Sequence, residues 1–337
     1  MPAFRNATVS EVVDERPGFA RVLLADGDRA YALTDLTGPV AVGDEVVINT
    51  TAVDLDLGSG GSHVVHWNLT RGPWAHPGPG HLMKLRYTSL QVDTGVAEEH
   101  GDVPSDLLGA PVVAAGVHSQ LPVVAAAIAR RRPGTRVAYV MTDGAALPIA
   151  MSDVVADLVR LGLVVGTVTA GHAFGGDIEA LNVASALASA RHRLEAEVII
   201  VVMGPGGAGT GSRLGFTALE VASVLDAAAW LGGHPIACLR CSSADARPRH
   251  QGISHHSITA LEAVRSEVDV AVPPGIVAPR AGRHRWHEID PGPPGPLLAA
   301  AGLRVTTMGR GPEDDPRYFA AAAAAGLLAV DLLAGDS

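Results

Sequence analysis

The densest group of reactive side chains in the sequence lies within residues 242–257. One carboxylate, two guanidinium groups and three imidazoles follow one another there, in the order Asp245, Arg247, Arg249, His250, His255 and His256. Histidine exchanges protons near neutral pH, and arginine neutralises anionic groups. This combination predicts a site that binds an anion and carries out acid–base chemistry on it, with Asp245, His250 and His255 as candidate catalytic residues.

Ser254 is the expected N-cap of a helix that begins directly after it. His255 and His256 would then lie at the positive end of that helix, where protonation of an imidazole is disfavoured. A neutral imidazole is suited to hydrogen bonding or to metal coordination. Either histidine could equally be a structural residue whose hydrogen bonds are satisfied inside the protein.

A glycine-rich loop spans residues 204–211, with the sequence GPGGAGTG. Its glycines allow backbone N–H groups to approach a ligand closely, and the N-terminus of a following helix favours an anion. The candidate ligand-binding residues here are Gly204, Gly206, Gly207, Gly209, Thr210, Gly211, Ser212 and Arg213, joined by Arg247, Arg249 and His256. The loop has neither a Walker-type Gly-Lys-Ser/Thr sequence nor Rossmann G-x-G-x-x-G spacing, so a tight turn between strand and helix is the alternative interpretation.

His172 lies in another polar segment, GHAFGGD at residues 171–177, and is a candidate acid or base. Asp143, in the segment MTDG at residues 141–144, is a further candidate catalytic residue. Asp177 or Glu179 could orient the His172 imidazole, or Asp177 could cap a helix expected to begin there. The cofactor is unknown; a divalent metal, if bound, would take its ligands from His172, Asp177, His250 and His255 or His256, although no H-E-x-x-H or paired C-x-x-C signature is present.

Alternating apolar strands and helices are expected to position these segments. The predicted strands are 112–117, 137–141, 163–169, 198–203, 236–239, 268–272 and 304–307, and the predicted helices are 121–131, 152–161, 177–193, 217–231, 256–265 and 316–325. Several strands are apolar on both faces, which is typical of a parallel sheet covered by helices on both sides. The pattern predicts a three-layer, Rossmann-like α/β fold. The reactive segments follow the carboxyl ends of its strands, where ligands bind in such sheets.

The first 70 residues have a different pattern, with short strands expected at 7–13, 19–25, 29–34, 45–53 and 63–67. Asp26-Gly27-Asp28 is a hairpin signal between the second and the third of these strands. The pattern predicts a small β-barrel of the OB or SH3 type at residues 1–70. A Gly- and Pro-rich linker at 71–80 and an α/β domain at 81–337 are expected to follow.

The composition is that of a globular protein: 47% of the 337 residues are hydrophobic and 18% are charged, which excludes general disorder. The longest apolar stretch, the alanine-rich segment 319–330, is interrupted by Gly326 and is too short for a membrane helix. The first residues lack the apolar core of a secretory signal, and only two cysteines are present, Cys238 and Cys241. A cytoplasmic location without membrane association is therefore expected. The C-x-x-C pair lies in a predicted strand region and is interpreted as core.

The net charge of −10 is unevenly distributed. Residues 1–75 hold five arginines against ten acidic residues, whereas residues 240–287 hold seven arginines against four acidic residues. The basic segment would attract a small anion. A nucleic-acid partner is disfavoured, because the barrel is acidic and has few aromatic residues for stacking on bases.

Several motifs along the chain resemble those of a bacterial family, the domain of unknown function 3866 family. They are GHLMKLRYT (80–88), VHSQLP (117–122), MTDGAALP (141–148), GHAFGGDIEALN (171–182), MGPG (203–206), GTGSRLGF (209–216), RHQGISHHS (249–257) and TMGR (307–310). The resemblance extends over nearly the whole chain. It implies that barrel and α/β part belong together in one polypeptide, and it implies no substrate.

The leading hypothesis is an enzyme, of undetermined reaction class, that acts on a small anionic metabolite, phosphorylated or nucleotide-like. The glycine loop and Arg213, Arg247 and Arg249 would hold the anion, and His172 with His250 or His255 would transfer protons. The alternative is a noncatalytic ligand sensor whose acidic barrel recruits a protein partner. A homo-oligomer remains open, and nucleic-acid binding through the barrel is the least favoured hypothesis.

Overall fold

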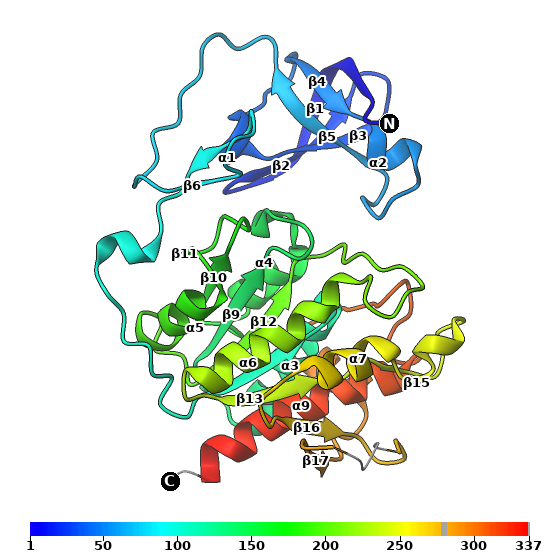
Figure 1. The fold of residues 1–337 in the computed structure, drawn as a ribbon. Coiled ribbons are helices and arrows are strands. Elements are labelled where there is room, and N and C mark those ends of the chain that lie inside the picture. Colours follow the sequence, from blue (N-terminus) through cyan, green and yellow to red (C-terminus); the bar gives the residue numbers. More distant parts are fainter. Residues whose placement is uncertain (278–281, 336–337) are drawn as a thin grey trace. The chain divides into compact units, whose positions relative to one another are not determined.

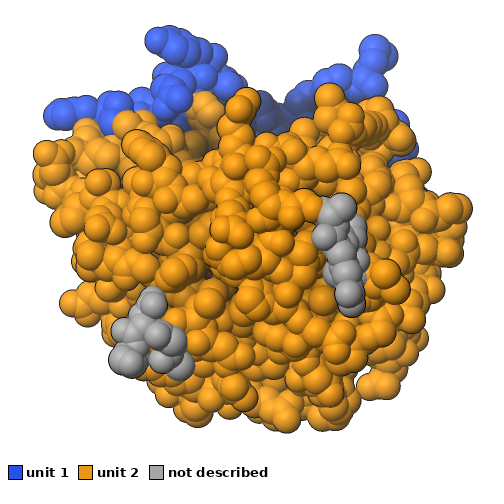
Figure 2. Space-filling model, turned by 60° about the horizontal axis from the view of Figure 1, so that its bottom comes forward, with its two compact units in different colours: residues 1–95 blue, residues 96–337 orange. Residues whose placement is uncertain are grey.

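The computed structural model describes residues 1–277 and 282–335. The chain forms two compact units, residues 1–95 and residue 96 onward (Figure 2). The first unit includes a short hairpin of β6 (Met83–Lys84) and β7 (Val92–Asp93), so it extends beyond the 70 residues expected for the barrel.

A closed barrel with the strand order β1-β2-β3-β5-β4 makes up most of the first unit (Figure 1). Its elements are β1 (Phe4–Arg16), β2 (Phe19–Leu24), β3 (Arg29–Ala32), α1 (Thr34–Thr37), β4 (Glu45–Asn49), α2 (Thr51–Asp54) and β5 (Ser62–Asn68). Alternate side chains of the strands point inward and form a separate hydrophobic core, which includes Val22, Val46 and Ile48. The predicted hairpin is confirmed: Gly27 adopts a φ of 90° between the antiparallel strands β2 and β3.

The second unit contains a parallel sheet in which the described strands follow the order β11-β10-β9-β12-β8-β13-β16-β17. The strands are β8 (Pro111–Ala115), β9 (Val137–Thr142), β10 (Gly166–Ala170), β11 (Ile178–Ala180), β12 (Val198–Met203), β13 (His234–Cys238), β16 (Asp269–Val272) and β17 (Arg285–Glu288). The central strands β8, β9 and β12 are buried along their whole length. The α/β fold with a preceding barrel is therefore confirmed.

Helices cover both faces of this sheet (Figure 1). One face packs against α3 (Leu121–Arg131), α4 (Asp153–Arg160), α8 (Pro294–Ala300) and α9 (Pro316–Gly335). The other face packs against α5 (Val183–His192), α6 (Val221–Trp230) and α7 (His255–Ala263). This is the three-layer arrangement that the apolar strands predicted.

The adjacent strands β8 and β12 form a topological switch point. The chain leaves β8 toward α3 on one face of the sheet, and it leaves β12 toward α6 on the opposite face. Connections that part in this way leave a crevice at the carboxyl ends of the two strands. Ligands bind at such crevices in open α/β sheets, so the strand order predicts a ligand site at this edge of the sheet.

Two local predictions were wrong. The segment 304–307 is not a strand; it crosses the carboxyl edge of the sheet between α8 and α9. The helix expected at 177–193 is divided into the short strand β11 and the helix α5, whose N-cap is Asn182 and not Asp177. The strand β17 and the helix α8 were not foreseen, because each is short and lies in a segment rich in Pro, Gly or His.

Helix α9 is the one described helix whose length and composition would allow it to cross a membrane, over Pro316–Leu333, and 61% of that window is buried inside the protein. It packs closely against α3, with Ala322, Ala325 and Phe319 fully buried. A Cβ atom on Gly326 would lie 2.6 Å from the carbonyl oxygen of Val124 in α3. The small residues of α9 therefore permit close packing of two core helices.

We expect Gly326→Ala to lower the free energy of unfolding by about 1–3 kcal/mol, because the added methyl group overpacks the contact between α3 and α9. Helix propensity alone predicts the opposite sign, a gain of up to about 1 kcal/mol. Urea unfolding followed by circular dichroism measures the change. Gly211→Ala is the matched control, since a Cβ atom there meets nothing within 4 Å; a stabilised Gly326→Ala protein would contradict the packing argument.

Candidate functional site

A cleft of about 600 Å³ lies at the switch point, at the carboxyl ends of β12, β8 and β13. Its walls come from the segment after β8, the glycine loop after β12, the loop after β13 and the segment 304–308. All of these segments belong to the second unit. Two of the loops predicted to carry reactive residues, those after β12 and β13, therefore line one cleft at the carboxyl edge of the sheet.

The structure brings together about half of the candidate residues. Those that line the cleft are Gly206, Gly207, Gly209, Thr210, Arg247, Arg249, His250 and His256. Asp245 and His255 lie directly behind this wall, in contact with Arg247 and with His256 respectively. The lining also includes Arg240, Arg304 and His118, which were not among the candidate site residues predicted from the sequence.

Asp245 fixes two of the arginines. Its carboxylate is 3% exposed and accepts two hydrogen bonds of 2.9 Å from Arg247 Nε and Nη2 and one of 3.0 Å from Arg240 Nη2. The Arg247 guanidinium holds the pKa of this carboxyl far below its usual value, so Asp245 stays ionised. Asp245 therefore orients these two arginines, and its negative charge is engaged in ion pairs with them.

Arg249 and Arg304 are different, because both are exposed at the cleft and no described acidic side chain forms an ion pair with either. No Asp or Glu is among the described residues that line the cleft. Four arginine side chains thus line one volume, and the Asp245 carboxylate that pairs with two of them lies outside the lining. Such a surface attracts anions.

The glycine loop is held by its own hydrogen bonds. Thr210 N donates to Gly215 O at 2.7 Å, and Thr217 N donates to Ala208 O at 2.9 Å. Within the described part of the chain, no acceptor is hydrogen-bonded to the N–H groups of Gly206, Gly207 or Gly209. Gly206 also has a φ of 88°, which a side chain would strain. These N–H groups remain as donors beside the cleft.

The remaining residues of this loop do not line the cleft. Arg213 is largely exposed and forms an ion pair of 2.8 Å with Glu262. Ser212 bonds within the loop to Thr210 and Gly215, and Gly211 faces open space. Gly204 is required for packing, since a Cβ atom there would lie 2.5 Å from the Ala146 carbonyl oxygen.

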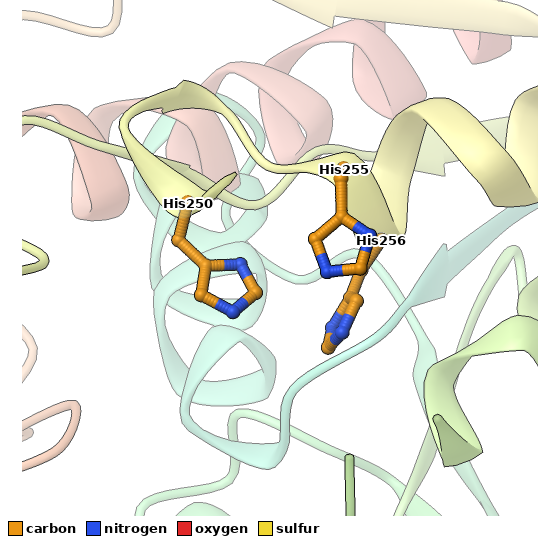
Figure 3. A group of neighbouring side chains, drawn as sticks. All are labelled: His250, His255 and His256. Carbon is orange, nitrogen blue, oxygen red and sulfur yellow. The ribbon is translucent and has the colours of Figure 1, made fainter. Parts of the chain in front are cut away.

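Three histidines converge at the loop after β13 (Figure 3). His250 ends the 3₁₀ turn Pro248–His250, and His255 and His256 begin α7. Ser254 caps this helix as predicted, accepting a hydrogen bond of 3.2 Å from His256 N. The His256 ring stacks on Phe216 with 3.9 Å between the ring centroids.

All three imidazoles are hard to protonate. Burial, aided by Arg240 and Arg247, lowers the pKa of His250 to about 4, and burial with the neighbouring histidines lowers that of His256 to about 3. The pKa of His255 is lowered as well, by burial and by Arg249. As expected from the sequence, the pKa values of His255 and His256 lie below the ordinary value of an imidazole. The causes are burial and the charge of nearby arginines, and not the helix dipole alone.

His172, Asp143 and Asp177 lie away from the cleft lining. His172 N donates to Asp143 Oδ2 at 2.9 Å, which joins the loops after β10 and β9. Asp177 lies at the opposite end of β10, where it accepts hydrogen bonds from Thr167 N and Oγ1. These residues therefore do not share a ligand position with His250 and His255.

A comparison with known protein families matches residues 29–326 to a family described as "Protein of unknown function (DUF3866)". The matched span includes every residue that lines the cleft. No curated protein and no solved structure matches the chain. The geometry of the cleft is thus the basis for any functional argument.

His118, on the cleft wall, supports the structure. Its Nδ1 lies 3.1 Å from Met203 O and its Nε2 lies 2.7 Å from Ser152 Oγ. A neutral ring that donates from Nδ1 to the carbonyl and accepts at Nε2 satisfies both contacts. Burial lowers its pKa from 6.5 to about 4.

We expect His118 to make the protein less stable in mild acid. Below pH 6.5 the unfolded chain protonates this imidazole and the folded chain does not, so the free energy of unfolding falls as the pH drops toward about 4. The loss is up to about 3 kcal/mol. Urea unfolding at pH 7.5 and pH 5 measures it in the wild type and in His118→Gln. The variant should lose less on acidification; equal losses would show that His118 does not titrate as described.

Proposed function

The chain belongs to the DUF3866 family of proteins of unknown function, and we propose that it is an enzyme that acts on a small anionic metabolite, phosphorylated or nucleotide-like. The observation that supports this most is the lining of the cleft: four arginines and no carboxylate among the described residues. Its volume of about 600 Å³ is within the range of about 300–1,000 Å³ that small-molecule sites occupy.

Two groups of donors would hold the anion. The guanidinium groups of Arg249 and Arg304 form no ion pair with any described residue and can make charge-assisted hydrogen bonds to a ligand, whereas Arg240 and Arg247 are already oriented by Asp245. The N–H groups of Gly206, Gly207 and Gly209 would add uncharged donors from the glycine loop. Phosphate oxygens match both kinds of donor.

The histidines would act through unprotonated nitrogen atoms. With a pKa of about 4, His250 is unprotonated at pH 7, so its Nε2 lone pair can either accept a proton from a bound water or hydroxyl group, as a weaker base than an ordinary imidazole, or coordinate a metal ion. The acid–base roles predicted from the sequence for His172 and Asp143 are not part of this proposal, because both residues lie outside the cleft lining. The class of reaction stays open.

A noncatalytic ligand sensor is the second candidate. The barrel has its own closed sheet and core, and the sequence of residues 1–75 carries ten acidic residues against five arginines, which suits recruitment of a basic protein partner. Phosphorus NMR of phosphorylated metabolites incubated with the protein would separate the two candidates. Conversion of a compound supports the enzyme, and binding without conversion supports the sensor.

A cytoplasmic location is part of the proposed function, since both cysteines are buried free thiols.

We expect the double variant Arg249→Gln/Arg304→Gln to bind inorganic phosphate or pyrophosphate at least tenfold more weakly than the wild type, because the cleft loses two positive charges that form no ion pair with any described residue. Isothermal titration calorimetry at two salt concentrations measures this, and wild-type affinity should fall as salt rises.

Arg213→Gln is the matched control, since it removes one positive charge from an exposed ion pair outside the cleft. Its affinity for phosphate should remain within about twofold of the wild type. Wild-type protein that binds no anion, or equal losses in the control, would contradict the proposed cleft function.

A further inference from the structure

His250, His255 and His256 form a compact group of side chains with one chemistry (Figure 3). One ring nitrogen of each lies within 4.8 Å of the corresponding nitrogens of the other two. The ring centroids are 4.4–5.2 Å apart. Nitrogens bound to one tetrahedral Zn²⁺ lie about 3.3 Å apart, so side-chain rotations that shorten these separations by about 1.5 Å would complete such a site.

Two ring nitrogens of this group have no hydrogen-bond partner among the described residues. The Nε2 atoms of His255 and His256 are buried and form no hydrogen bond with any described residue. Leaving a buried polar atom unsatisfied costs about 1–3 kcal/mol, so such atoms call for a ligand or an ordered water. Two of them in adjacent imidazoles point to a shared occupant.

The third histidine is oriented by its neighbour. His250 is 1% exposed, and its Nδ1 lies 2.7 Å from Ser254 Oγ. This contact leaves Nε2 as the ligand atom, which is the arrangement in which metal-binding histidines are usually held. The backbone beneath them is fixed as well, because Ser254 N donates to Arg240 O and Arg240 N donates to Ser257 Oγ.

We propose that His250, His255 and His256 bind one transition-metal cation of the Zn²⁺ type, with a remaining coordination position open to the cleft. Imidazole donors suit Zn²⁺, Co²⁺, Ni²⁺ and Cu²⁺, whereas Mg²⁺ and Ca²⁺ require oxygen ligands that this group does not offer. His250 and His256 line the cleft, so the open position faces the volume in which the anion would bind.

The positive charges of nearby arginines affect metal binding at the three histidines. Arg240 and Arg249 act electrostatically on all three histidines, and a dication beside them is disfavoured by Coulomb repulsion. Asp245 offsets part of this charge, and an anion in the open position would offset more. Metal and anion should therefore strengthen one another's binding. This coupling rests on the proposed function, whereas the metal site itself does not.

Metal binding is tested on the full chain after removal of metals with a chelator and dialysis into phosphate-free buffer. Titration calorimetry with ZnCl₂ should give one equivalent per chain, and MgCl₂ should give none. His255→Asn and His256→Asn should each weaken Zn²⁺ binding at least 100-fold. The control His172→Asn, at a histidine outside the cleft lining, should bind Zn²⁺ as the wild type does. Absent wild-type binding, or unchanged binding in both cluster variants, overturns the proposal.

A measurement on the wild type covers the case in which the variants do not fold. Co²⁺ bound by three imidazoles should give visible absorption bands of a four- or five-coordinate ion, and an octahedral Co²⁺ spectrum overturns the site. Addition of inorganic phosphate should tighten Zn²⁺ binding in the wild type but not in Arg249→Gln/Arg304→Gln. Zn²⁺ binding without this effect overturns the coupling and supports the metal site alone; phosphate binding without any Zn²⁺ binding overturns the metal site and leaves the proposed function standing.

Discussion

The cleft depends on two buried carboxylates that hold one loop. Asp245 orients Arg240 and Arg247, while Asp315, which is 0% exposed, accepts hydrogen bonds from Ser242 Oγ and Arg310 Nε. The loop after β13 would otherwise have to bring several positive groups together against their mutual repulsion. Removing one partner of a buried ion pair commonly costs about 3–5 kcal/mol, because the remaining charge is left uncompensated. The arrangement of the arginines and of the neighbouring histidines thus rests on these two acids.

The loop after β13 also combines a positively charged anion site with neutral histidines, two properties that usually exclude each other. Histidines near an anion site are often protonated, which adds positive charge to the site. Here arginine supplies the charge, and that same charge, together with burial, keeps the imidazoles neutral. The cleft therefore presents fixed cations and free nitrogen lone pairs side by side. A site that has to bind an anion and also accept a proton or a metal ion requires both kinds of group.

Much of this arrangement could be predicted from the sequence, because parallel strands bring their carboxyl ends to one edge. That rule placed the glycine loop, Arg249 and His250 together. It did not separate His172 from them, because the order of strands in the sheet is set by long-range pairing: β9 and β10 lie on the far side of β12 from β8 and β13. Asp177 was misjudged for a local reason, since the chain turns back along β10 before β11 begins. Arg304 was missed because the β-branched segment VTT that follows it is typical of a strand, whereas it crosses the edge of the sheet.

The position of Asp315, directly before α9, links the cleft to the core of the domain. Helix α9 buries Tyr318 and Phe319 against the sheet, and Tyr318 also bonds to Ser119 on the cleft wall. The loop that carries the arginines is thus anchored to the same helix that completes the hydrophobic core. The amide protons that bond to these anchors, those of Ser243 and Asp245, should exchange with solvent mainly through opening of the whole domain and not through local fraying. Occupancy of the cleft would accordingly protect distant amides in β8 and β12, so the entire domain would respond to a ligand that touches only its edge.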